Sequence, residues 1–156
     1  MSAFSAHAGL LGATVIVTFY FPDSSTIYCT NGPAVVGAGV EYTSSCPGYE
    51  PTSIDIGDTT VTVDTGGFGW SPGSFNGFSI DVVGDDFLTI NYTGGTMGVT
   101  AATVAGGDAW LNFADQSGGV ANFSFEVAGG RVPEPASIAL VGLALLGAAG
   151  ARRRVG

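Results

Sequence analysis

The stretch SIDIGDTTVTVDT, residues 53–65, alternates apolar and polar side chains on both sides of a Gly-Asp pair. A period of two places Ile54, Ile56, Val61 and Val63 on one face of a strand pair and the intervening polar residues on the other. This period is that of a half-buried β-strand and differs from the period of a helix. We therefore expect these four aliphatic side chains to face a hydrophobic core.

Similar strand patterns recur along the chain, separated by turns rich in glycine, proline, asparagine and aspartate. The further strands that we expect are 13–21, 26–30, 34–42 with a glycine bulge, 75–83, 87–93, 109–115 and 121–127. Residues 31–33, Asn-Gly-Pro, read as a turn. Two hairpins are expected, one joined through residues 84–86 and the other through residues 116–119. Together the patterns predict an all-β fold, an antiparallel β-sandwich of about 8–10 short strands, over residues 9–128, which we call the body.

The last 25 residues, VPEPASIALVGLALLGAAGARRRVG, differ from the body. A Pro-Glu-Pro triplet precedes an uncharged apolar run over residues 136–151, and three arginines follow. As a helix this run would be about 24 Å long, against a hydrocarbon core of about 30 Å that arginine side chains help to reach across. We expect a single C-terminal transmembrane helix rather than a buried amphipathic helix, because the run has no polar face. The arginines place residues 152–156 in the cytoplasm and the body outside.

This order of elements resembles the PEP-CTERM sorting signal of Gram-negative bacteria. The residues that carry the resemblance are Val132, Pro133, Glu134, Pro135, Ala136 and Ser137, the leucines and glycines of the apolar run, and Arg152, Arg153 and Arg154. The resemblance implies processing near the triplet by an exosortase, an integral-membrane cysteine peptidase, while the apolar run holds the precursor in the inner membrane. The processed protein would then lie at the cell surface or in the extracellular matrix, with exopolysaccharide and biofilm as its surroundings. The body segments TVIVTFYFPDSSTIY, VVGAGVEY, SIDIGDTTVTV and FNGFSIDV also resemble PEP-CTERM proteins that have no assigned activity.

The ends of the body are set by short signals. Ala6, His7 and Ala8 form the A-x-A pattern that signal peptidase reads. We expect residues 1–8 to be the remnant of a truncated signal peptide, the alternative being an ordinary flexible N-terminus. Residues 129–135 form the linker that contains the Pro-Glu-Pro motif.

Charge excludes some partners. The chain has 13 acidic residues and 4 basic ones, and the basic residues are Arg131, Arg152, Arg153 and Arg154. Residues 1–130 therefore contain no cation that could neutralise phosphates, which excludes nucleic acid as a partner. The same composition argues against docking of the body on an anionic lipid surface.

Cys29 and Cys46 are the two cysteines of the chain. In an exported protein an isolated pair is most simply a disulfide. The alternatives are a metal site and a catalytic cysteine. A metal site would lack further ligands and a catalytic cysteine would lack a base, because the one histidine, His7, lies at or before the expected processing point.

Four aspartates could bind calcium with the help of backbone carbonyls: Asp55, Asp58, Asp85 and Asp86. They lie at or beside turns, where aspartate next to glycine is ordinary turn chemistry, and no EF-hand spacing is present. The favoured interpretation is therefore that the protein needs no metal and no other cofactor.

Catalysis is not expected. Residues 9–130 contain neither histidine nor lysine, so a hydrolase triad has no base. Glu41, Glu50 and Glu126 are candidates for a glycosidase pair. Their alternation with apolar neighbours, or their place in a loop, favours solvated charge instead.

The aromatic residues leave two functions open. Trp70, Phe75, Phe78 and Trp110 belong either to the core or to a platform on which sugar rings stack. The first function is that of a non-catalytic surface or matrix protein associated with exopolysaccharide. The second is that of a carbohydrate- or calcium-binding module that presents Trp70. A buried Trp70 would favour the first and an exposed Trp70 the second.

Overall fold

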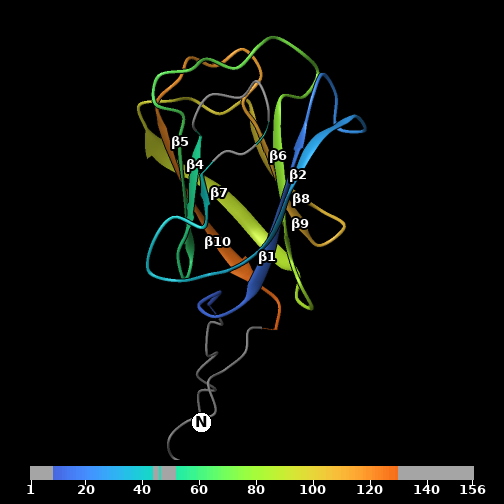
Figure 1. The fold of residues 1–156 in the computed structure, drawn as a ribbon, viewed down its shortest axis with the longest axis vertical. Coiled ribbons are helices and arrows are strands. Elements are labelled where there is room, and N and C mark those ends of the chain that lie inside the picture. The colour runs from blue at the N-terminus through green and yellow to red at the C-terminus, as the bar shows by residue number, and fades with distance from the viewer. Residues whose placement is uncertain (1–8, 44–45, 47–51, 130–156) are drawn as a thin grey trace, which may run out of the picture.

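The computed structural model describes residues 9–43, 46 and 52–129 (Figure 1). These residues form ten β-strands and no helix. The strands are β1 Thr14–Tyr20, β2 Ile27–Val35, β3 Tyr42–Thr43, β4 Ser53–Ile56, β5 Thr60–Asp64, β6 Gly77–Val82, β7 Phe87–Gly95, β8 Ala101–Ala105, β9 Asp108–Asn112 and β10 Val120–Val127. The expected all-β class of the body is confirmed. The expected transmembrane helix lies outside the described residues, and none of the residues that the structure does describe forms a helix able to cross a membrane.

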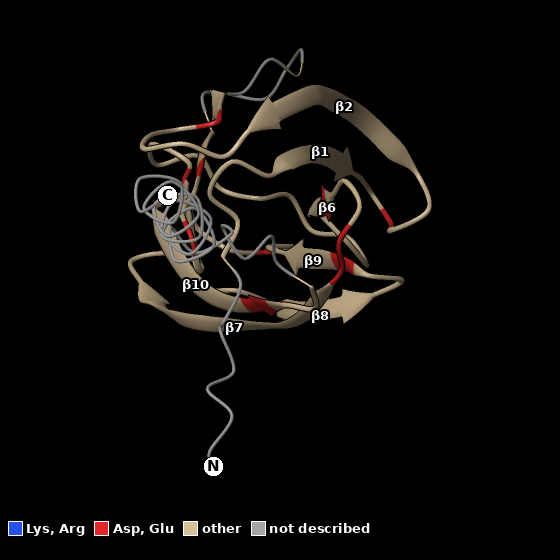
Figure 2. Ribbon diagram, turned by 90° about the horizontal axis from the view of Figure 1, so that it is seen from below, with Lys and Arg blue, Asp and Glu red and all other residues tan. Residues whose placement is uncertain are grey.

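The strands form two five-stranded antiparallel sheets that pack as two layers (Figures 1 and 2). The first sheet has the order β2-β1-β6-β9-β8, and the second has the order β3-β4-β5-β10-β7. Each sheet has one face on the shared core and one outer face, as the alternating patterns require.

The core lies between the sheets. Ile54, Ile56, Val61 and Val63 each have 0 % of their surface exposed, so the expectation from the alternating stretch is confirmed. The first sheet contributes every second residue of β1 and β6 from the opposite side: Val15, Val17, Phe19, Phe78, Ile80 and Val82. The two inner faces thus meet in one continuous apolar cluster, whose burial is the main stabilising contribution.

Both expected hairpins at residues 84–86 and 116–119 are wrong. β6 pairs with β1 and β9 in the first sheet, whereas β7 pairs with β10 in the second. The turn after β6, with Gly84 at a φ of 82°, therefore carries the chain from one layer to the other. β9 and β10 also lie in different sheets. Alternation fixes which side of a strand is buried, but it does not specify the neighbouring strand, and a short turn can join two layers as well as two neighbours.

The segment from Asn31 to Glu41 also differs from expectation. Residues 31–33 do not turn but continue β2, and the register shifts between Val15 and Val17, where the extra residue of β2 forms a bulge. Pro33 is tolerated because β2 is an edge strand with one free side. The expected strand 34–42 is wrong, since β2 ends at Val35 and β3 starts at Tyr42. Between them Val36 turns into the core and donates its N–H to the Ala13 carbonyl, which leads the chain towards the second sheet.

Candidate functional site

Cys29 and Cys46 form a disulfide with Cα atoms 6.0 Å apart, within the usual range for this bond. Cys29 lies on β2 of the first sheet, and Cys46 lies between β3 and β4 of the second. The bond therefore joins the two layers at the edge where β2 ends the first sheet. As expected, neither cysteine is free for metal binding or catalysis.

Trp70 is a core residue. Its indole is 6 % exposed, stacks on Phe113 with ring centroids 4.9 Å apart, and donates its Nε1–H to the Met97 sulfur at 3.3 Å. Phe78 is fully buried beside Phe113. Trp70 is thus not available to stack on a sugar, which is the outcome that favours a structural role for this residue.

The four aspartates named for calcium do not converge on one point. Asp55 lies on β4 opposite Thr62. The Asp58 carbonyl accepts a hydrogen bond from the Leu10 N–H at 2.9 Å.

In the turn between β6 and β7, Asp85 Oδ1 accepts hydrogen bonds from the backbone N–H groups of Asp86 and Gly129, each at 2.9 Å. Among the described residues no group of three or more acidic, histidine or cysteine side chains could hold a metal ion. Asp85 therefore has the turn chemistry expected of an aspartate beside glycine, whereas Asp55 lies on a strand and not in a turn.

Two of the glutamates considered for catalysis can be placed. Glu41 bridges two backbone N–H groups, those of Gly37 at 2.9 Å and Ile56 at 2.6 Å. It therefore fixes the crossing segment against β4. Glu126 is exposed on β10. Glu50 lies outside the described residues.

A second group of aromatic rings lies on the outer face of the first sheet, away from the core. Tyr20 on β1 and Trp110 on β9 have ring centroids 4.9 Å apart, and Phe75 packs edge-on against both, at 6.2 and 5.8 Å. Tyr20 and Trp110 are half-buried, whereas Phe75 is 9 % exposed. We call these three residues the aromatic cluster. The sequence contained a signal for it, because Tyr20 and Trp110 occupy the polar-facing phase of their strands.

Polar groups flank the aromatic cluster on the same face. Trp110 lies opposite Ser79 on β6 and Thr103 on β8. Asp81 and Asp108 occupy the next outward positions on β6 and β9. Partial burial raises the pKa of the Asp108 carboxyl, and the carboxylates of Asp81 and Asp86 raise it further. The surface therefore combines flat rings with the exposed hydroxyl group of Thr103 and closely spaced carboxylates, whereas Ser79 is buried.

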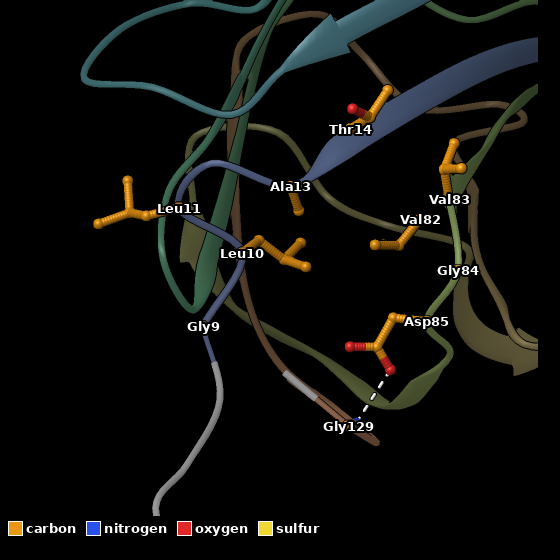
Figure 3. A pocket seen from close by; sticks show the side chains of 10 residues that line it. All are labelled: Gly9, Leu10, Leu11, Ala13, Thr14, Val82, Val83, Gly84, Asp85 and Gly129. Carbon is orange, nitrogen blue, oxygen red and sulfur yellow. Dashed lines mark hydrogen bonds between the residues drawn. The ribbon is translucent and has the colours of Figure 1, made fainter. Parts of the chain in front are cut away.

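The two ends of the body meet at one pole of the molecule. Gly9 and Gly129 line the same small pocket, together with Asp85 in the turn after β6 (Figure 3). The bond from the Gly129 N–H to Asp85 fixes the chain there (Figure 3). Figure 2 shows acidic residues and no lysine or arginine in the part of the chain that is described. The C-terminal segment thus follows the body from the pole at which Asp85 lies.

The sorting residues named from the sequence, Val132 to Ser137, and the arginines 152–154 lie outside the described residues. In comparisons with known proteins, residues 131–154 match the PEP-CTERM protein-sorting motif. No curated protein and no solved structure matches the chain. The expected sorting motif is therefore confirmed, and it indicates an exported protein that is processed by an exosortase.

Proposed function

We propose that the chain is a non-catalytic surface or extracellular-matrix protein that associates with exopolysaccharide after exosortase processing. The observation that carries this proposal is the PEP-CTERM motif over residues 131–154, directly after a disulfide-linked all-β body. In this proposal residues 136–151 span the inner membrane of the precursor, and residues 152–156 remain in the cytoplasm. Processing near Pro133–Pro135 then releases the body.

The position of the chain ends supports this arrangement. Gly129 is held at the pole by Asp85, and Pro133 follows after three intervening residues. An extended chain covers at most about 3.6 Å per residue, so the triplet would start within roughly 14 Å of the pole. The pole would therefore face the membrane in the precursor, and the opposite end of the sandwich would point outward.

The composition of the body supports a role without catalysis. Residues 9–130 supply neither histidine nor lysine as a base. Glu41 is engaged with two backbone N–H groups, and Glu126 is exposed on β10, two strands away from β4 in the second sheet. A paired-carboxylate mechanism needs two carboxyl groups on opposite sides of one substrate. The hydrogen bonds of Glu41 and the position of Glu126 do not favour such a pair.

The first prediction concerns the triplet. Replacing Glu134 by Ala removes the one charge of the Pro-Glu-Pro triplet. We expect uncleaved precursor to accumulate in the inner membrane of the native host. The measurement is membrane fractionation followed by intact-mass spectrometry. Glu126→Ala removes the same charge from an exposed site outside the motif, and this matched control should be processed normally. Processing of Glu134→Ala at the wild-type level would show that the triplet is not read.

Replacing Arg152, Arg153 and Arg154 by Gln tests the topology separately. Without the cationic stop the apolar run should insert less reliably, so that uncleaved chain appears beyond the membrane instead of in it. A host that lacks the peptidase should retain the wild-type precursor in the membrane. Wild-type surface protein that still carries the three arginines would contradict the proposal, because the tail would then be a permanent anchor.

A further inference from the structure

The aromatic cluster lies where a matrix ligand could reach it. Thr14, at the start of β1, lines the pocket at the membrane-facing pole, and Tyr20 ends the same strand. Six residues of strand cover about 20 Å. Under the proposed function the Tyr20 side of the cluster therefore lies at the end of β1 that is remote from the membrane-facing pole.

The cluster is not required by the inter-sheet core. Phe19 and Phe78 fill the inner side of β1 and β6, and Tyr20 faces outward from the neighbouring position. Between Tyr20 and the β9 strand lies Gly77, which has no side chain, so the tyrosine ring can lean over β6 to contact Trp110. The result is an aromatic surface built across three neighbouring strands of the first sheet, β1, β6 and β9.

The polar partners of the rings indicate the ligand chemistry. The Trp110 Nε1–H is satisfied by the Ala105 carbonyl at 3.2 Å, so the ring offers its apolar faces and edges. Thr103 is exposed beside it, and Asp81 and Asp108 follow along the strands. Aromatic rings pack against the C–H faces of sugar rings, while hydroxyl and carboxylate oxygens accept hydrogen bonds from sugar hydroxyl groups.

Charge selects among polysaccharides. Residues 9–130 contain no lysine or arginine, and two carboxylates flank the rings. An anionic polymer would be repelled at this surface, whereas the hydroxyl groups of an uncharged polymer would donate to the carboxylates. The charge pattern therefore complements a neutral hexose polymer.

We propose that the half-buried rings of Tyr20 and Trp110, which the buried Phe75 ring supports, form with Thr103, Asp81 and Asp108 a binding surface for a neutral polysaccharide. This inference rests on the proposed function, because it names the surface through which the body would contact exopolysaccharide. It replaces Trp70, which is buried, with Trp110 as the ring that a sugar would contact.

The test is affinity electrophoresis of the full chain in mild detergent, through gels that contain laminarin, yeast mannan, hydroxyethylcellulose or alginate. Wild-type protein should be retarded by at least one of the three neutral polymers and not by alginate. Trp110→Leu and Tyr20→Leu keep apolar bulk over the sheet but remove the flat rings, and each should weaken binding by about tenfold or more. Phe68→Leu, at an aromatic that is 51 % exposed elsewhere, is the matched control and should bind as wild type does.

Near-ultraviolet circular dichroism and urea unfolding establish that each variant is folded before its binding is compared. If the wild type binds a neutral polymer and the leucine variants bind equally well, the cluster is not the binding surface, although association with polysaccharide stands. Retardation by alginate alone overturns the charge argument. If no neutral polymer retards the wild type, the binding proposal fails, and recovery of the processed protein from the host matrix then tests the proposed function independently.

Discussion

At the scale of single residues, several carboxylates of the body stabilise backbone conformation. Asp23 accepts hydrogen bonds from the hydroxyl and N–H of Ser25 and from the Thr26 N–H, and these bonds lower its pKa. Glu41 bridges two N–H groups in a similar way. Asp108 is different, because its partial burial and two neighbouring carboxylates raise its pKa.

Asp108 should therefore destabilise the fold at neutral pH. A raised pKa means that the folded state binds the proton more tightly than the unfolded state, so the stability that protonated Asp108 contributes is lost as the pH rises through the raised pKa. Asp108→Asn should increase the free energy of unfolding in urea at about pH 7 and change it little at about pH 2.5, where the carboxyl is protonated in both states.

Glu126→Gln, on an exposed part of β10, is the control for the loss of one negative charge. An equal gain in both variants would assign the effect to net charge. A gain for Asp108→Asn that persists at low pH would contradict the argument from the pKa.

At the scale of elements, the edge strand β2 shows how the sheet ends. Ile27 and Val35 are 61 % and 64 % exposed on this strand, which would favour pairing with another chain. Two register shifts against β1 and the presence of Pro33 interrupt the regular edge. The disulfide then ties β2 to the second sheet, so this edge is both irregular and held in place.

The contact between β6 and β9 depends on a glycine. Gly77 pairs with Asn112, and a Cβ atom there would meet the Leu111 carbonyl oxygen. Because backbone cannot move aside as a side chain can, Gly77→Ala should push the strands apart and lower the free energy of unfolding by about 1–3 kcal/mol. Urea unfolding measures this change.

Gly39→Ala is the matched control, since a Cβ atom at Gly39 would meet nothing within 4 Å. It should be neutral or slightly stabilising, because alanine restricts the unfolded chain. Equal stability of the two variants would show that β9 adjusts to a methyl group at Gly77.

At the scale of the whole molecule, two features connect the layers on the side of β2 and β3. The Tyr42 hydroxyl donates a hydrogen bond to the Val15 carbonyl at 2.6 Å, from the second sheet to the first. Burial raises the pKa of Tyr42 to about 12. The disulfide makes the covalent connection between the same two sheets.

Removing the disulfide should loosen this connection. Cys29 and Cys46 are 17 residues apart, and a loop of this size contributes about 3 kcal/mol in the chain-entropy model. Cys29→Ala should lower the free energy of unfolding by about this amount in urea under oxidising conditions. Reductant should produce a similar loss in the wild type and little further change in the variant. A variant as stable as the oxidised wild type would show that non-covalent contacts alone hold this edge.

The sequence by itself determined the class of the fold and the buried side of its strands. The alternation of Ile54, Ile56, Val61 and Val63 predicted four fully buried side chains, because the period of a strand is independent of the strands beside it. The two cysteines and the sorting motif were also readable in the sequence. A disulfide in an exported chain and a triplet followed by an apolar run and arginines depend on composition and order, which do not need a fold to be recognised.

Tertiary structure alone decided which strands became neighbours. β6 and β7 are adjacent in sequence but lie in opposite layers, because pairing depends on long-range packing that no local pattern encodes. The same long-range packing placed Trp70 inside and Trp110 outside. Two tryptophans with similar local chemistry thus acquired different environments, and the partners of Trp110, brought together from β1, β6, β8 and β9, exist as a surface only in the folded sheet.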